Sequence, residues 1–312
     1  MSKDEPVAAI SSEAVRPRPT SDLGPKSNSR AIRNNLATVM IWGAFILALI
    51  PLVWILWTVL SRGLSVILSP TWWLKDQSGA GAPAFDHNVR GARHAIVGTL
   101  EISLITAVIA IPIAVMTAVY LVEYGRGRLA RAVSFMVDIL SGVPSVVAAL
   151  FLYAVWVTTF GIALIPVVAS LALVLLMIPV VTRSTEEMLK LVPNELREAS
   201  YALGVPKWKT ITRIVLPTSL SGIITGSLLG LARVMGETAP LLILAAYTQY
   251  LNQNPFTGSM ASLPTFIYQQ AGSISVPIAA DRVWGAACTL ILLVLAINLL
   301  GRFVGRFAKV KN

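Results

Sequence analysis

The sequence predicts an all-α integral membrane protein with six transmembrane helices. Of its 312 residues, 55% are hydrophobic and only 13% are charged, whereas soluble globular chains carry about 25% charged residues. The mean hydropathy of +0.73 agrees with this class. A helix needs about 20 apolar residues to cross a bilayer. Six apolar runs are long enough, and they lie near Leu36–Leu60, Ala95–Val122, Ala132–Val157, Ile162–Val181, Leu220–Ala246 and Trp284–Val304.

Two tails flank this transmembrane domain of residues 35–304. Residues 1–34 combine Ser, Pro, Asn and charges of both signs without apolar periodicity, which predicts a disordered cytoplasmic tail. The first apolar run begins only near Leu36 and is too long for a cleavable signal peptide. Residues 305–312 form a short basic tail, also predicted to be cytoplasmic.

The lysine and arginine residues indicate the orientation, because they accumulate in cytoplasmic loops. With the N-terminal tail inside, six lie in Lys3–Arg33, three in Arg126–Arg131, six in Arg183–Arg213 and four in Arg302–Lys311. Only four of the 25 fall in the two outer loops, residues 61–94 and 247–281. We therefore expect a multi-pass protein of the cytoplasmic (inner or plasma) membrane with both termini in the cytoplasm. The net charge of +10 is then a topology signal, and no nucleic-acid partner is needed to explain it.

The sequence offers no signal for a metal site or a disulfide. Cys288 is the single cysteine and lies in an apolar run, so no internal disulfide can form. His87 and His94 have no cysteine or acidic cluster at metal-ligand spacing. We therefore expect no metal.

Prolines interrupt several apolar runs, and the sequence 142–145 (Gly-Val-Pro-Ser) is the most disruptive of these breaks. Asp138 lies seven residues after Arg131, about 10 Å at helical rise. Its role stays open between a function and a contact at the inner membrane interface.

The segment 182–217 is a polar stretch between two apolar runs. Pro193 and Asn194 predict the start of a short helix that ends at Gly204. Pro206 can start a second helix, because proline at the first helical position loses no hydrogen bond. Pro217 is expected to turn the chain back into the membrane. This two-helix projection has a shape that another protein can bind.

Arg233 and Glu237 lie inside the fifth apolar run, where a charge costs at least about 2.5–3.5 kcal/mol. At about 100° per residue in a continuous helix, they share one face with Gly222, Gly226 and Gly230. Glycines at this spacing let helices approach closely. Two interpretations remain open. Either the two charges pair with each other or with a neighbouring span, or they line a polar path for an anion.

The polar segment also carries a known pattern. Glu198-Ala199-Ser200, three residues, Gly204, nine residues and then Ile214 to Pro217 resemble the EAA loop of ABC importer permeases. The departure is Ser200, which replaces the usual second alanine, and both residues are small. The resemblance covers roughly residues 95–304. It implies a type I, MetI-like permease core with the first span as an addition.

In that family the first short helix docks into a groove of a cytoplasmic ATPase subunit. The resemblance therefore implies that a coupling loop over residues 182–217 joins this chain to two ATPases through Glu198, Ala199, Ser200, Gly204, Leu216 and Pro217. The phosphate-binding pattern GxxxxGK[ST] occurs nowhere in the sequence. We therefore expect no cofactor and no enzyme activity in this subunit, with ATP and Mg²⁺ bound by the partner ATPase.

Two further stretches resemble PstA-type permeases of phosphate importers. They are residues 232–239 (Ala-Arg-Val-Met-Gly-Glu-Thr-Ala) and residues 176–183 followed by Glu186 and Glu187. The resemblance implies that Arg183, Arg233 and Glu237 line the path of inorganic phosphate. It also implies a PstC-type permease and an extracytoplasmic phosphate-binding protein as partners. The chemistry fits, because arginine binds tetrahedral oxyanions through its rigid donor fork, and a glutamate can accept the proton that phosphate carries.

Three alternatives remain open at this point. The same machine could import another oxyanion, such as sulfate or molybdate. In a different class, an ion-coupled secondary transporter could use Glu237 to carry protons. A membrane scaffold without transport would need neither Arg233 nor Glu237 for solute flux.

Overall fold

The predicted all-α membrane fold is confirmed by the computed structural model, which describes residues 28–80 and 91–307. Within these two ranges the regular structure is helical and no strand is present. Five helical stretches are long and apolar enough to cross a membrane, and the number is six if a bent helix pair is counted as one span. The five are Ile32–Ile67, Arg93–Tyr124, Pro166–Lys190, Lys207–Met235 and Pro277–Phe303.

The chain divides into two compact units, residues 1–55 and 56–312. Helix α1 (Asn28–Ile67) contributes to both and continues through Pro51. It already includes the last residues of the tail predicted for 1–34, and the rest of that tail lies outside the described residues. Helix α12 (Pro277–Phe307) likewise extends beyond Val304, and residues 308–312 of the predicted basic tail lie outside the described part.

The third apolar run is interrupted at residues 142–145, where the sequence predicts the most disruptive proline break. It forms α4 (Gly127–Gly142) and α5 (Ser145–Tyr153), which continues as a π-helical segment, Ala154–Thr159. The two parts are bent by 105°. The helix ends here because Pro144 disfavours the helical conformation of the residue before it. Val143 accordingly has an extended backbone with ψ 126°.

The fifth apolar run is also broken. Helix α9 (Leu216–Met235) ends at Gly236, and a separate short helix, α10 (Ala239–Leu244), follows. Pro240 stands in the first turn of α10, where proline is favoured because its missing N–H is not needed. The prediction of one continuous helix from Leu220 to Ala246 is therefore wrong.

The centre of the second unit is the packing of α3 (Arg93–Val119) against α6 (Pro166–Lys190). Small residues line this contact, and buried alanines recur on α3 from Ala107 to Ala118. Small side chains let membrane helices approach closely. The Thr106 hydroxyl donates to Ile102 O of its own helix at 2.8 Å and to Ser170 O of α6 at 3.3 Å. These two helices form the framework on which the other elements rest.

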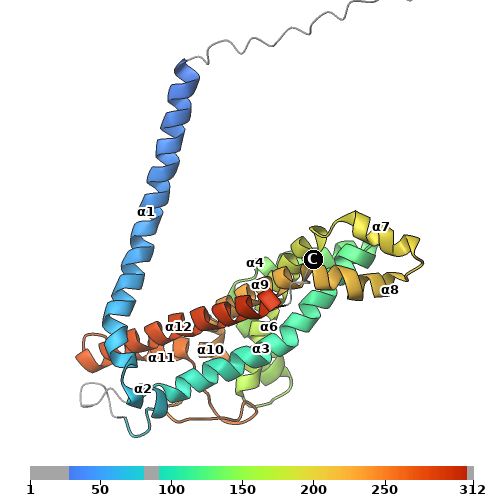
Figure 1. The fold of residues 1–312 in the computed structure, drawn as a ribbon. Helices are drawn as coiled ribbons and strands as arrows, with labels where there is room; N and C mark the ends of the chain where they lie inside the picture. The colour runs from blue at the N-terminus through green and yellow to red at the C-terminus, as the bar shows by residue number, and fades with distance from the viewer. Residues whose placement is uncertain (1–27, 81–90, 308–312) are drawn as a thin grey trace, which may run out of the picture. The chain divides into compact units, whose positions relative to one another are not determined.

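The two ends of this framework differ (Figure 1). At one end, α2 (Pro70–Leu74) and α11 (Leu263–Ala271) pack beside the start of α3. Trp72 of α2 is fully buried there, and its indole donates to Thr289 Oγ1 at 2.9 Å. At the other end, α7 (Asn194–Ala202) and α8 (Lys207–Thr210) project as a helical hairpin.

Asp76 joins two loops at the α2–α11 end. Its carboxylate accepts hydrogen bonds from Ser78 N at 3.0 Å and from Leu251 N at 3.2 Å. Burial raises the pKa of this carboxyl, but the hydrogen bonds outweigh the burial and hold the pKa below its ordinary value. The ionised carboxylate thus fastens the loop after α2 to the loop after α10.

Candidate functional site

The α7–α8 hairpin contains the EAA-like residues. Gly204 has a φ of +73° and makes the turn between the two helices, a conformation that glycine adopts without steric cost. Ser200 is buried, and its hydroxyl lies 2.8 Å from Thr210 Oγ1 of α8. An alanine at position 200 could not make this bond. Glu198 and Ala199 are exposed on α7.

The chain returns to the bundle at the hairpin turn, and Pro217 does not turn it. Residues from Lys207 to Met235 form one helical stretch, in which the π-helical segment Ile211–Val215 leads into α9. Leu216 and Pro217 are the first residues of α9, where proline is tolerated. The expected turn at Pro217 is therefore corrected. In addition, α6 continues to Lys190, so the polar segment expected from Thr182 begins as helix.

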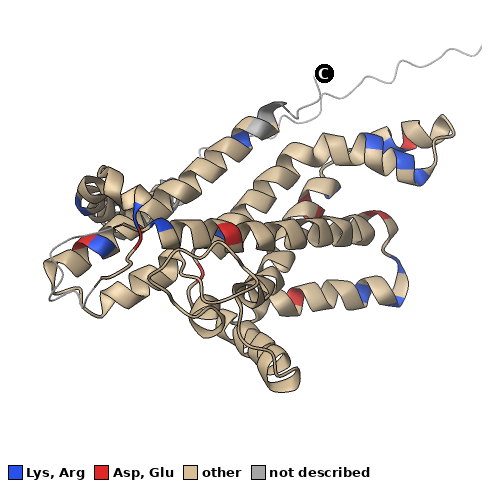
Figure 2. Ribbon diagram, turned by 90° about the horizontal axis from the view of Figure 1, so that it is seen from below, with Lys and Arg blue, Asp and Glu red and all other residues tan. Residues whose placement is uncertain are grey.

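The hairpin carries both charged residues and exposed apolar side chains. Leu196, Tyr201, Leu203 and Trp208 are exposed, and Leu203 is 83% exposed. Figure 2 shows charged residues of both signs on this hairpin, while long stretches of the bundle helices have none. Exposed apolar groups surrounded by polar ones are typical of a protein-binding surface.

The hairpin is fixed to the bundle by residues that the sequence analysis missed. Arg197 of α7 contacts Glu123 of the π-helical segment Tyr120–Tyr124, with 2.9 Å between Arg197 Nη2 and Glu123 Oε1. Lys207 of α8 donates to the carbonyl of Glu123. The partners are 74 and 84 positions apart, so no local pattern could have indicated these contacts.

Arg183 lies near the end of α6 and is engaged by two carboxylates. Its Nη1 donates to both oxygens of Glu186 at 3.0 Å, and its Nε donates to Asp138 Oδ1 at 3.1 Å. Its Nη2 also donates to Ser134 of α4. Lys190 adds a second cation, 3.5 Å from Glu186 Oε2. The residue that the sequence left open, Asp138, thus pairs with Arg183 and joins α4 to α6.

The three glycines of α9 lie against α6. A Cβ added to Gly222 would meet the Met188 side chain, and one added to Gly226 would lie 1.9 Å from Ser184 Oγ. At Gly230 it would approach Val181 Cγ2 at 2.9 Å. The absence of side chains therefore permits the close approach of the two helices.

Arg233 and Glu237 stand at the break after α9. Glu237 lies beyond the last helical residue, so its expected place on the helix face of Arg233 is corrected. The Arg233 Nε–Glu237 Oε1 distance is 4.0 Å, and the two side chains are 61% and 20% exposed. A contact this long and exposed contributes little to stability. It leaves the guanidinium accessible to other anions.

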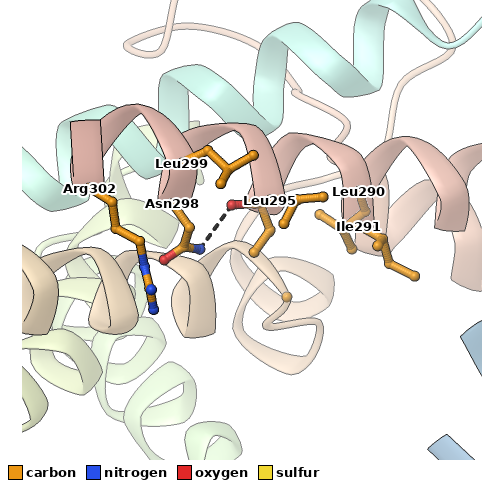
Figure 3. A pocket seen from close by; sticks show the side chains of 8 residues that line it. Leu290, Ile291, Leu295, Asn298, Leu299 and Arg302 are labelled. Atoms are coloured by element: carbon orange, nitrogen blue, oxygen red, sulfur yellow. Dashed lines mark hydrogen bonds between the residues drawn. The ribbon is translucent and has the colours of Figure 1, made fainter. Parts of the chain in front are cut away.

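An open groove of about 580 Å³ runs beside the break, along α12. Its wall is apolar, with Asn298 and Arg302 toward one end (Figure 3). Asn298 donates to Val294 O of its own helix at 2.9 Å. Neither Arg233 nor Glu237 lines this groove, although Gly236 does. The part of the chain that the structure describes holds no group of three His, Cys, Asp or Glu side chains able to bind a metal ion.

The fold is shared with ABC importer permeases of known structure. A chain of a bacterial alginate ABC transporter, solved with an alginate-bound periplasmic protein, matches with a TM-score of 0.62 at 16% identity. The match covers 91% of this chain and 99% of that one. A chain of the MetNI methionine ABC transporter matches with a TM-score of 0.56 at 20% identity, over 68% of this chain and 93% of that chain. The chain therefore has the fold class of the MetI-like membrane subunits of ABC importers.

Sequence comparison places the chain within this class. Residues 110–309 match the family described as binding-protein-dependent transport system inner membrane component. A relative from Mycobacterium tuberculosis (strain CDC 1551 / Oshkosh), the phosphate transport system permease protein PstA 1, is 51% identical over 277 residues. These cover 88% of this chain and 89% of the relative. The chain therefore belongs to this family of inner membrane components and, within it, to the PstA permeases.

Proposed function

We propose that this chain is the permease subunit of an ATP-driven importer that moves inorganic phosphate across the cytoplasmic membrane. The observation that carries the proposal is the projecting α7–α8 hairpin, with the EAA pattern and exposed apolar side chains, in a chain 51% identical to a phosphate transport permease. The membrane subunit itself is then non-catalytic. ATP and Mg²⁺ are bound by separate ATPases, and this subunit needs no cofactor.

The hairpin is the surface that would meet an ATPase. Leu196, Tyr201 and Leu203 offer the apolar contact area, while Gly204 and the Ser200–Thr210 bond hold one hairpin geometry. This assignment puts the hairpin, and with it both chain termini, on the cytoplasmic side, in agreement with the distribution of basic residues. The opposite end, with α2 and α11, then faces an extracytoplasmic phosphate-binding protein.

The solute path requires a second permease, for which we propose a PstC-type subunit. Arg233 is the residue best placed to meet phosphate, because its side chain is largely exposed and its contact with Glu237 is long. The Glu237 carboxylate can accept a hydrogen bond from the protonated oxygen of phosphate, and sulfate has no such proton at neutral pH. Arg183 is occupied by Asp138 and Glu186 in this structure. Its part in transport therefore requires phosphate or a structural change to displace a carboxylate.

The alternatives make different demands on the same residues. An importer of sulfate or molybdate would use the hairpin in the same way and would not need a hydrogen-bond acceptor at Glu237. A secondary transporter would need Glu237 but no ATPase, and a scaffold would need neither Arg233 nor Glu237 for flux. The relatives named as phosphate transport permeases favour phosphate over these alternatives.

The hairpin assignment is tested with the variant Gly204→Pro. Proline fixes φ near −65°, whereas Gly204 has φ +73° and its N–H donates to Tyr201 O at 2.9 Å. We expect the variant complex to lose the ATP hydrolysis that is stimulated by phosphate-loaded binding protein, although the chain still inserts. The matched control is Gly204→Asn, because asparagine tolerates a positive φ, and it should keep most of the stimulation. Unchanged stimulation in Gly204→Pro would rule out this hairpin as the coupling element.

A further inference from the structure

We infer that Glu123, Arg197 and Lys207 form a strut that positions the α7–α8 hairpin on the end of α3. The inference rests on the proposed function, since positioning matters for transport only if the hairpin transmits movements of an ATPase. Arg197 and Lys207 act here through the hairpin helices, and neither needs to touch the solute. They are positioning residues.

Arg197 makes a hydrogen bond with every N–H of its guanidinium. Its Nε and Nη2 donate to Glu123 Oε1 at 3.1 and 2.9 Å, and Nη2 also donates to Leu189 O at 3.0 Å. Its Nη1 donates to Val192 O at 2.6 Å and to Asn194 Oδ1 at 3.3 Å. The five N–H groups of the guanidinium thus make five hydrogen bonds. One side chain thereby connects the end of α3, the end of α6 and the start of α7.

The Glu123–Arg197 pair is largely buried where the hairpin meets the continuation of α3. The Glu123 side chain is 5% exposed and that of Arg197 is 13% exposed. Removing two charges from water is costly, so a buried ion pair is weak evidence for a gain in stability. Its better supported use is to specify one arrangement among several. We therefore assign the pair to orientation of the hairpin.

Lys207 brings the second hairpin helix to the same place. Its ammonium donates to the carbonyl of Glu123 and lies 4.9 Å from the ring centroid of Tyr124. Both hairpin helices are therefore held by the segment Tyr120–Tyr124, which directly continues α3.

The strut gives the hairpin a route to α3, in addition to the helical stretch by which α8 continues into α9. Helix α7 has nine residues, and an isolated helix this short is marginal in water. The orientation of α7 must therefore come from its contacts, which include the strut. Through the strut, a displacement of the hairpin reaches α3, which packs along α6 and extends to the α2–α11 end.

The test uses the complete complex with its ATPases, reconstituted in vesicles, and measures phosphate taken up per ATP hydrolysed. The variants are Glu123→Gln, which removes the charge at constant shape, and Arg197→Lys, which keeps the charge but loses the five-donor fork. We expect uptake per ATP to fall about tenfold in each, which corresponds to about 1.4 kcal/mol of coupling free energy. The double variant should be no worse than either single one, because the residues act as a unit.

The control is Arg128→Lys, the same substitution at an exposed arginine in the first turn of α4. It should leave uptake per ATP unchanged. If Glu123→Gln and Arg197→Lys both keep the wild-type ratio, the strut has no positioning role. If either variant loses the ATPase during purification while Arg128→Lys retains it, the hairpin has lost its orientation, as the inference requires.

A second measurement separates this inference from the proposed function. If the wild-type complex shows no ATP-dependent uptake, the proposed function fails, and amide hydrogen exchange of residues 194–202 then tests the strut alone. Exchange there should be about tenfold faster in Glu123→Gln than in the wild type, because local opening becomes easier. Exchange at the wild-type rate would overturn the inference.

Discussion

The Arg183 guanidinium is held by two carboxylates with very different exposure. Asp138 is 63% exposed, whereas Glu186 is 6% exposed and also contacts Lys190. An exposed ion pair contributes about 0–1 kcal/mol. Loss of a hydrogen-bond partner in a buried place costs more, because the remaining charge stays desolvated. The two carboxylates should therefore contribute unequally to stability, although both bind the same arginine.

We predict that Asp138→Asn lowers the free energy of unfolding by less than about 1 kcal/mol and that Glu186→Gln lowers it by about 1–3 kcal/mol. Each variant retains side-chain shape, so the comparison isolates the charge. Denaturant unfolding of the purified chain in detergent measures both values. Equal losses in the two variants would contradict the assignment of Glu186 as the structural partner of Arg183.

At the scale of the helix, the contact between α9 and α6 depends on glycines, which have no side chain. The three glycines Gly222, Gly226 and Gly230 each lie where a Cβ would meet α6. Gly226 is the most restrictive position, since an added Cβ would lie 1.9 Å from Ser184 Oγ and 2.7 Å from Ser184 Cβ. The Ser184 side chain can avoid this clash only if it changes rotamer or if α6 shifts.

We predict that Gly226→Ala lowers the free energy of unfolding by about 1–3 kcal/mol through overpacking. Gly43→Ala is the matched control, because a Cβ at Gly43 in α1 would meet no atom of the described residues within 4 Å. The double variant Gly226→Ala/Ser184→Gly should recover part of the loss, since it removes the clashing atoms. Denaturant unfolding in detergent measures all three variants. A wild-type value for Gly226→Ala would show that the helices separate freely at this point.

The length of the apolar runs and the positions of the prolines predict the helices. They predict the breaks between helices only in part. Pro144 predicts the interruption between α4 and α5, whereas the 105° bend depends on packing that no local pattern encodes. The sequence does not mark the end of α9 at Met235, because apolar residues continue to Ala246 on the far side of Arg233 and Glu237. Pro240 was the available signal, since proline favours the first turn of a new helix.

In the candidate site, too, local sequence signals predict some features, whereas others depend on packing. Gly204 and Pro206 are local signals, and the turn forms where they predict it. The Glu123–Arg197 contact joins residues 74 positions apart and requires the hairpin to fold back on the end of α3. Arg183 and Asp138 meet only because the bend after α4 leaves α4 beside α6. Such contacts depend on tertiary structure.

At the scale of the whole second unit, the α3–α6 framework separates two ends of different structure. The α7–α8 hairpin projects at one end, while α2 and α11 close the other. The exposed Arg233 lies on α9, between the hairpin and the break at Gly236. This order fits a subunit in which an ATPase acts on one end and solute enters from the other.

The central claim is that the complex moves phosphate at the expense of ATP, and uptake of labelled phosphate by vesicles containing the co-purified complex tests it most directly. We predict uptake that requires ATP, that persists in excess sulfate and that falls in Glu237→Gln at unchanged protein level. Uptake driven by a proton gradient without ATP, or displaced by sulfate as strongly as by unlabelled phosphate, would contradict the account.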